Sequence, residues 1–195
     1  MEFDAGRDDL IVGVIGAGAM GQGIVQVSLQ GGMSVVLFDA KPDGAASAAA
    51  LVEKRLDRSA ERGCLEADAV AVMKSKLIVV DDLSDFAGCH AVVEAVFEDL
   101  DIKHAVYTEL EKHVSADCII ASNTSSLPIS SLGRPCGYQH RFAGFHFFNP
   151  VPLMRLVEVI RGSSTKDWVV EGLVKLGERM GRTPVVVRDH PGFLV

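Results

Sequence analysis

Short apolar runs alternate with longer amphipathic stretches along this chain of 195 residues. The first run, Leu10 to Ile15, predicts a buried strand. A glycine turn and a helical pattern from about Ala19 to Gln30 follow, and Ser34 to Phe38 predicts the next strand. Such a strand–helix–strand unit joins two parallel strands by a right-handed crossover.

Two helices are predicted next, at about 43–62 and 66–76, because strong helix formers fill this stretch and Gly63 interrupts it. Later helices are predicted at 101–114 and 165–180. The remaining apolar runs predict strands at Leu77–Val80, Ala91–Ala95, Cys118–Ala121, Phe142–Phe145, Leu156–Ile160 and Val185–Val187. This repeated alternation predicts an α/β fold with an open, mostly parallel, doubly wound sheet.

Composition agrees with a compact domain and restricts its partners. Hydrophobic residues make up 48% and charged residues 23%, which argues against disorder. The net charge of −7 leaves little room for a large basic surface, so we expect no nucleic acid and no membrane as partner. No apolar stretch reaches the roughly 18 residues of a membrane span. The acidic start, MEFDAGRDDL, lacks the layout of a signal peptide, and we expect a cytoplasmic protein.

The four cysteines do not have the spacing of metal ligands. Cys64, Cys89, Cys118 and Cys136 are far apart and form no C-x-x-C pair, so we expect no metal site. Cys118 lies in an apolar run and is interpreted as a small buried hydrophobic residue.

A glycine motif stands between the first strand and the first helix. Gly16 permits a tight turn, Gly18 lets the backbone approach a pyrophosphate, and Gly21 allows close helix–strand packing. Asp39 ends the second strand, 18 residues after Gly21, where a carboxylate can accept both ribose hydroxyls of an adenosine and repel the 2′-phosphate of NADP. A simple turn or cap is the alternative for Asp39. The spacing as a whole favours dinucleotide binding, with NAD as the cofactor.

A second cluster follows the strand predicted at Phe142–Phe145. His146 can accept and return a proton near neutral pH, which suits the oxidation of a hydroxyl. Glu158 can hold the other ring nitrogen if the turn with two prolines brings its strand back beside His146. A lone histidine near apolar residues is usually structural, so these residues leave both interpretations open.

Two further segments are consistent with ligand binding or with ordinary structure. The polar run Ala121–Ser126 follows an apolar strand, where ligands of doubly wound sheets bind, but its residues also suit a turn. Lys54, Arg58 and Arg62 share one face of a predicted helix, with Arg55 beside them. They can dock the phosphates of a large acyl carrier, or form a solvated charged face.

Together these features resemble the L-3-hydroxyacyl-CoA dehydrogenase family, which includes 3-hydroxybutyryl-CoA dehydrogenases and the matching region of fatty-acid oxidation multienzymes. The resemblance runs from about Asp9 to the last residue, with G-A-G-x-M-G, S-N-T-S-S, H-F-F-N-P-V-P-L-M-x-L-V-E and P-G-F-L-V in the family's order. The string from His146 to Glu158 is the most specific, because it covers 13 positions.

The resemblance implies a Rossmann-type NAD-binding domain over residues 1–195 that oxidises L-3-hydroxyacyl-CoA to 3-oxoacyl-CoA in fatty acid β-oxidation. His146 would take the proton of the 3-hydroxyl while a hydride passes to NAD, and Glu158 would orient His146. Ser125 and Asn149 would hydrogen-bond the substrate or the nicotinamide. The implied cofactor-binding residues are Gly16, Gly18, Ala19, Met20, Gly21, Asp39, Glu98 and Lys103.

The resemblance also assigns the helical hairpin at about 43–76. In the family it is a projecting arm that meets coenzyme A, which implies substrate contacts through Arg55 and Arg62. The sequence departs from the family pattern at Arg155, commonly Lys, and at Pro128, which interrupts the stretch after Ser126. Neither departure touches the implied chemistry.

A larger departure concerns the end of the chain. In the family, P-G-F-L-V is followed by an active-site Asn and by a helical domain that closes over the substrate and forms a homodimer. This sequence stops at Val195, so we expect a piece of a longer protein, carrying only part of the site. Two alternatives remain at this stage: a module that binds NAD without turnover, and a related dehydrogenase that acts on a sugar acid.

Overall fold

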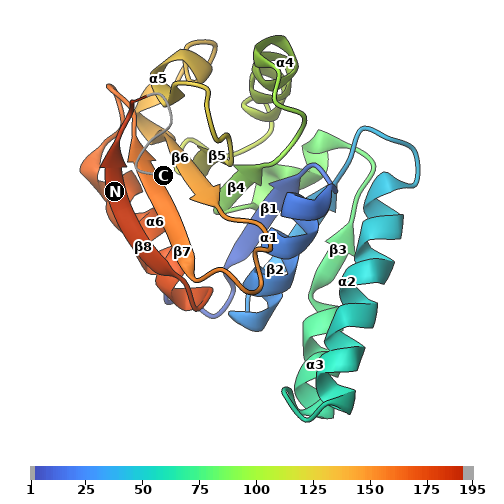
Figure 1. Cartoon of the computed structure of the whole chain (residues 1–195). Coiled ribbons are helices and arrows are strands. Elements are labelled where there is room, and N and C mark those ends of the chain that lie inside the picture. Colours follow the sequence, from blue (N-terminus) through green and yellow to red (C-terminus); the bar gives the residue numbers. More distant parts are fainter. Residues whose placement is uncertain (1–2, 191–195) are drawn as a thin grey trace.

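An eight-stranded sheet forms the centre of the computed structural model, which describes residues 3–190 (Figure 1). Its strands lie in the order β3-β2-β1-β4-β5-β6-β7-β8. Strands β1 to β6 are parallel to their neighbours, whereas β7 is antiparallel to β6 and parallel to β8. The bounds are β1 (Ile11–Ile15), β2 (Ser34–Phe38), β3 (Leu77–Val79), β4 (Ala91–Glu94), β5 (Ile119–Ser122), β6 (Phe142–Phe147), β7 (Leu156–Arg161) and β8 (Thr183–Arg188).

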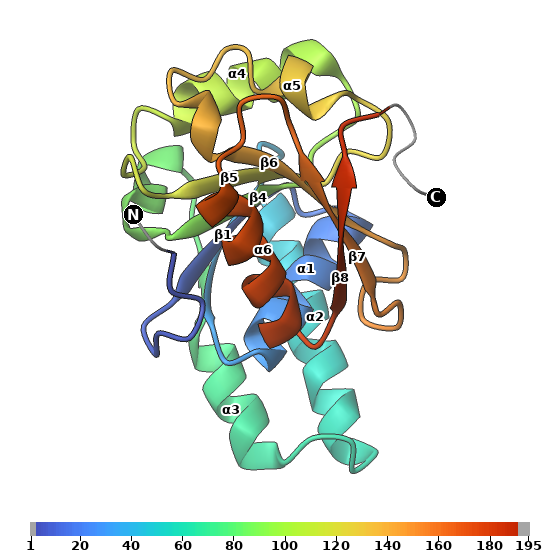
Figure 2. The same ribbon diagram turned by 90° about the vertical axis from the view of Figure 1, so that its left-hand side faces the viewer.

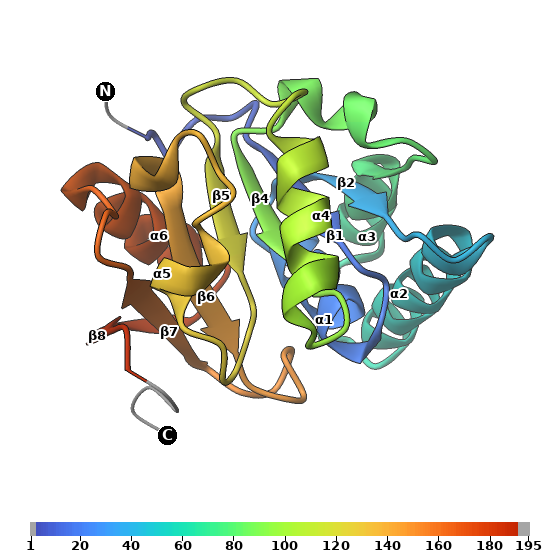
Figure 3. The same cartoon turned by 90° about the horizontal axis from the view of Figure 1, so that it is seen from above.

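Helices cover both faces of this sheet. Figure 3 shows α4 and α5 over one face, and Figure 2 shows α6 and α1 against the other. The α-helices are α1 (Ala19–Gln30), α2 (Gly44–Glu61), α3 (Ala67–Ser75), α4 (Leu100–Leu110), α5 (Ile129–Leu132) and α6 (Asp167–Arg179). Two short 3-10 helices, η1 (Leu83–Gly88) and η2 (Gln139–Arg141), complete the described chain.

The core has two layers, because successive side chains of a strand point to opposite faces. On one side, Val14 packs in a cluster with Ile24 of α1 and Leu173 of α6. On the other side, Ile15 belongs to a cluster with Tyr107 of α4. A parallel sheet buried on both faces reads as continuous apolar runs, which is why the strands were visible in the sequence.

Helices α2 and α3 extend from the sheet as an arm (Figure 1). The buried residues of α2 all lie before its last turn, and they are Ala45, Ala48, Ala49, Val52 and Leu56. The far end of the arm therefore carries mainly solvent-facing side chains. Gly63 turns the chain between the two helices with a φ of +69°, a conformation that glycine adopts without strain.

The predicted fold class, a mostly parallel doubly wound α/β sheet, is confirmed by this topology. The helix predicted at 101–114 is wrong at its end, because α4 stops at Leu110 and turns bring Val114 into the core. The short elements α5, η1 and η2 were missed, since three to six residues carry too little periodicity to be recognised. Cys118 is buried as expected.

The order of the strands creates a crevice at the carboxyl edge of the sheet. From β1 the chain crosses to β2 on one side, whereas β4 lies on the other side of β1. Loops that leave β1 and β4 therefore diverge at this point, which is where doubly wound sheets bind their ligands. Strands β1, β4, β5 and β6 all end at this edge, so the segments that follow them begin there.

Candidate active site

The glycine turn after β1 is shaped by backbone contacts. Gly16 has a φ of +102°, and a Cβ added there would lie 2.5 Å from the carbonyl oxygen of Ala95. A Cβ at Gly21 would overlap the carbonyl oxygen of Gly16, which confirms that close packing requires glycine at this position. By contrast, a Cβ at Gly18 meets no described atom within 4 Å. Gly18 therefore leaves open space in front of the turn.

Helix α1 presents its N-terminus to this open space. It begins at Ala19, its first turn holds no acidic residue, and no described side chain caps it. The amide N–H groups of Ala19, Met20 and Gly21 precede the first intrahelical hydrogen bond, donated by the Gln22 N–H to Gly18. Unpaired N–H groups and the positive end of the helix dipole suit an anionic group such as a pyrophosphate.

Asp39 lies beside the same turn. Its Oδ2 accepts a hydrogen bond from the Ala17 N–H at 2.6 Å, and its Oδ1 accepts one from the Lys41 N–H at 2.8 Å. Asp39 also lines a hollow of about 370 Å³ next to Ala45 and Val79. Two backbone donors thus orient a carboxylate at the end of β2, where an adenosine ribose would be held.

His146 and Glu158 face each other across the antiparallel pair β6–β7. They are register partners, and His146 Nδ1 lies 2.7 Å from Glu158 Oε2. The Glu158 side chain is 1% exposed and the His146 side chain 12% exposed, so the pair is shielded from solvent. The turn after β6 does fold the chain back, as the sequence-based hypothesis required. A carboxylate on one ring nitrogen fixes the tautomer of the imidazole.

A cleft of about 320 Å³ brings the predicted residues together at the carboxyl edge. It is lined by Met20, Ala95, Val96, Glu98, Asn123, Ser125, His146, Phe147, Phe148 and Asn149. Met20 lies at the start of α1, and the others follow β4 or β5, or lie in and after the last two residues of β6. Imidazole, hydroxyl, amide and carboxylate groups thus surround one space beside the glycine turn, which suits a polar substrate and a nicotinamide.

Glu98 and Lys103, both expected near the cofactor, occupy different depths. Glu98 lines the cleft, whereas the Lys103 side chain is only 1% exposed and lies 3.2 Å from Glu98 and 2.6 Å from Glu94. Partial burial opposes ionisation of Glu98, but the hydrogen bond from Thr124 and the charge of Lys103 outweigh it and lower the pKa of Glu98. Glu98 therefore presents a carboxylate to the cleft.

Sequence reasoning missed Glu94, and it considered Asn123 only as part of the polar run Ala121–Ser126. Asn123 Oδ1 accepts the Phe147 N–H at 2.8 Å, and so joins the segment after β5 to the end of β6. Glu94 is fully buried at the end of β4. A charged residue inside an apolar run was the available signal for Glu94, and it was interpreted only as part of the strand predicted at Ala91–Ala95.

A second, basic pocket of about 310 Å³ lies between α1 and α2. Arg55, Arg58 and Arg62 line it, whereas Lys54, expected on the same face, does not. Arg55 also donates to Gln22 Oε1 of α1 at 2.9 Å. Gln26, a residue that the sequence did not single out, is 6% exposed in this pocket, and its Oε1 has no hydrogen-bond partner among the described residues. Cationic groups with an unpaired acceptor suit an anionic ligand that also carries a donor.

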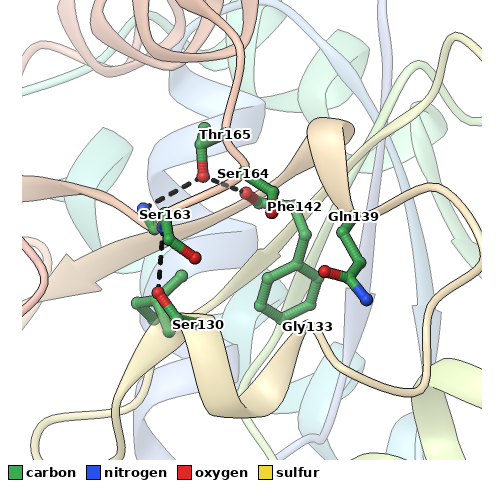
Figure 4. A pocket seen from close by; sticks show the side chains of 9 residues that line it. Ser130, Gly133, Gln139, Phe142, Ser163, Ser164 and Thr165 are labelled. Atoms are coloured by element: carbon green, nitrogen blue, oxygen red, sulfur yellow. Dashed lines mark hydrogen bonds between the residues drawn. The ribbon is translucent and has the colours of Figure 1, made fainter.

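A third pocket, under α5, is too small for a substrate (Figure 4). Its volume is about 10 Å³, close to the space of one water molecule. Thr165 Oγ1 donates to the Phe142 carbonyl at 2.6 Å, and Ser130 Oγ accepts the Ser163 N–H at 2.9 Å. These bonds close the pocket, so its polar groups are structural.

Other sequence-based expectations concern membranes, metals and the last motif. Within residues 3–190 the structure has no helix that could cross a membrane, and no group of three or more His, Cys, Asp or Glu side chains arranged for a metal ion. The closing P-G-F-L-V motif at 191–195 lies outside the described residues.

Comparisons with known proteins identify relatives of this chain. A probable 3-hydroxybutyryl-CoA dehydrogenase of Deinococcus radiodurans is 43% identical over 182 residues, which cover 93% of this chain and 65% of the relative. The fatty acid oxidation complex subunit alpha of Pseudomonas aeruginosa is 38% identical over 98% of this chain and 27% of its own length. The chain thus spans less than two thirds of these relatives.

The fold comparison gives the same result. The crystal structure of (S)-3-hydroxybutyryl-CoA dehydrogenase from Ralstonia eutropha superposes with a TM-score of 0.92 at 36% identity, over 95% of this chain and 65% of that one. Residues 11–190 match the family model described as 3-hydroxyacyl-CoA dehydrogenase, NAD binding domain. The expectation of NAD as cofactor is thereby confirmed. The chain belongs to the family of 3-hydroxyacyl-CoA dehydrogenase NAD-binding domains.

Proposed function

We propose that the protein containing this chain oxidises L-3-hydroxyacyl-CoA to 3-oxoacyl-CoA, with His146 as general acid/base. The observation that carries the proposal is the His146–Glu158 pair, 2.7 Å apart, whose His146 lines a cleft that adjoins the glycine turn. Bound NAD accepts the hydride from C3 of the substrate. The other requirement of the reaction is a base for the proton of the 3-hydroxyl.

His146 meets this requirement through its pairing with Glu158. A carboxylate at Nδ1 keeps the proton of a neutral imidazole on that nitrogen, so Nε2 is the basic atom. When Nε2 takes the hydroxyl proton, the imidazolium is stabilised by the buried Glu158 charge. In the reverse direction His146 returns this proton to the 3-oxo oxygen.

Further residues of the cleft and the turn have proposed binding roles. Ser125 and Asn149, which both line the cleft, hydrogen-bond the substrate or the nicotinamide amide. Asp39 accepts the ribose hydroxyls, and Glu98 contacts the nicotinamide half of the cofactor. The N-terminal amides of α1 (Ala19, Met20 and Gly21) hold the pyrophosphate.

The basic pocket is the proposed site of the coenzyme A portion. Arg55 and Arg62 provide positive charge for its phosphates, and Arg58 lines the same wall. The unpaired Gln26 Oε1 can accept a hydrogen bond from an amide or hydroxyl of the same ligand. Homodimer formation, a role in fatty acid β-oxidation and a cytoplasmic location stay predictions for the whole protein.

The experiment is to measure NADH formation from L-3-hydroxybutyryl-CoA by the chain and by His146→Gln, with His113→Gln in the turn after α4 as matched control. General acid/base catalysis typically contributes about 10²–10⁴-fold, so His146→Gln should lose that factor in kcat while His113→Gln keeps the rate. Equal rates for the two variants would remove His146 from the mechanism.

Two further measurements separate the alternative functions. NAD binding detected by calorimetry, without any oxidation of substrate, would favour an NAD-binding module for this chain. Oxidation of a sugar acid without the coenzyme A moiety would favour a related dehydrogenase instead. A substrate panel with and without coenzyme A distinguishes these outcomes.

A further inference from the structure

Glu94 is a fully buried carboxylate that none of the roles above uses. Its Oε1 accepts hydrogen bonds from the Val96 N–H at 2.7 Å and from Lys103 Nζ at 2.6 Å. Its Oε2 accepts from Ser122 Oγ at 2.8 Å and from the Tyr107 hydroxyl. Burying charge is costly even when it is paired, and apolar side chains would fill the same space without that cost. Stability alone therefore does not explain why a charged side chain occupies this buried position.

Lys103 links Glu94 to the wall of the cleft. Its ammonium lies between the two carboxylates, 2.6 Å from Glu94 and 3.2 Å from Glu98. Lys103 is buried, whereas the Glu98 side chain is 36% exposed and lines the cleft. Two carboxylates and one ammonium leave a net negative charge, and Glu98 is the member of this trio that lines the cleft.

The same two carboxylates hold the segment 122–126. Ser122 Oγ, which donates to Glu94, also accepts the Thr124 N–H at 3.2 Å. Glu98 Oε1 accepts from the Ser125 N–H and from Ser126 Oγ, each at 3.2 Å, and from the Thr124 hydroxyl. The segment is thus fixed from the buried side by Glu94 and from the cleft side by Glu98.

We propose that Glu94 is a positioning residue for the nicotinamide half of NAD, a role that rests on the function proposed above. Through Lys103 it holds the Glu98 carboxylate at the cleft, and through Ser122 it holds the segment that carries Ser125. The net negative charge favours the cationic ring of oxidised NAD over the neutral ring of NADH. Glu94 itself does not line the cleft.

The experiment compares ligands that differ only at the nicotinamide. Calorimetry gives the Kd of NAD⁺, NADH and ADP-ribose, which lacks the nicotinamide ring, for the whole chain and for Glu94→Gln. We expect Glu94→Gln to raise the Kd of NAD⁺ roughly ten-fold, a change of about 1.4 kcal/mol in binding free energy, and the Kd of NADH by a smaller factor. ADP-ribose should change by less than about two-fold, because its binding does not involve the nicotinamide subsite.

Two further variants separate positioning from folding. Ser122→Ala removes one hydrogen bond to Glu94 with little change in volume. It should raise the Kd of NAD⁺ relative to that of ADP-ribose, by a smaller factor than Glu94→Gln does. This variant tests the proposal if Glu94→Gln does not fold. Tyr107→Phe removes a donor but keeps both ion pairs of Lys103, and should lower the melting temperature without changing the ratio of the two Kd values.

The outcomes are distinct for the two proposals. If both Glu94→Gln and Ser122→Ala weaken the binding of NAD⁺ and of ADP-ribose equally, the positioning role of Glu94 is overturned and the proposed function still stands. If the unaltered chain binds neither ligand, the proposed function fails and this inference fails with it.

Discussion

The two sides of the carboxyl edge are built from different materials. The proposed nucleotide side consists mainly of backbone: Gly16, Gly18 and Gly21 shape a turn, the N–H groups at the start of α1 have no side-chain cap, and Asp39 lies beside them. The catalytic side consists of side chains held across an antiparallel pair, with His146 opposite Glu158. Substitutions should therefore act on shape and affinity on the first side, and on reaction rate on the second.

The largest effect is expected on the catalytic side, for Glu158→Gln. Loss of the buried charge removes the stabilisation of the imidazolium, so kcat should fall on the order of 10²–10⁴-fold. The KM for the acyl-CoA and the Kd for NAD should change by less than about two-fold, because Glu158 does not line the cleft. Glu171→Gln, at an exposed position of α6, is the control and should keep full activity. A large rise in KM with unchanged kcat would contradict the proposed role.

At the proposed nucleotide side, alanine substitutions at Gly21 and Gly18 should differ in their effects on stability and on NAD affinity. Gly21→Ala places a Cβ against the Gly16 carbonyl and should cost about 1–3 kcal/mol of stability, seen as a lower melting temperature. Gly18→Ala places its Cβ in open space and should keep the melting temperature, yet weaken NAD by roughly ten-fold or more if the pyrophosphate occupies that space. Unchanged NAD affinity in Gly18→Ala would move the pyrophosphate elsewhere.

The smallest effect is expected at the arm, because its proposed contact is with the coenzyme A portion, away from the reacting atoms. Arg62→Ala should raise the KM for the acyl-CoA about two- to five-fold, because exposed ion pairs contribute up to about 1 kcal/mol. The effect should shrink at high salt. Lys54→Ala, on the same helix but outside the pocket, is the matched control. If both variants raise KM equally, charge in general and not this pocket attracts the substrate.

The sequence predicted the strands and the glycine turn well, because their signals are local. Buried parallel strands are continuous apolar runs, and a turn with a positive φ at Gly16 needs glycine. Lys103 illustrates the limit of such signals: its position was expected to contact the cofactor, and the structure places its ammonium inside, between two carboxylates. Nothing in a helical pattern distinguishes an exposed lysine from a buried, paired one.

The basic pocket shows a similar limit. Helical periodicity grouped Lys54 with Arg58 and Arg62, whereas the pocket between α1 and α2 has Arg55 in place of Lys54. Which residues of α2 face α1 depends on how the two helices pack, and that follows from side chains far apart in the sequence. Gln26 was missed for the same reason, since its unpaired oxygen becomes meaningful only beside the arginines.

The sequence by itself determined the fold class, the place of the nucleotide turn and the identity of His146 and Glu158 as candidates. Each of these depends on residue type and spacing within a short segment. Only the tertiary structure decided that β7 runs antiparallel to β6 and brings Glu158 within 2.7 Å of His146. It also decided that the Lys103 ammonium lies buried between Glu94 and the cleft-lining Glu98, because the packing of α4 against the sheet turns this side chain inward.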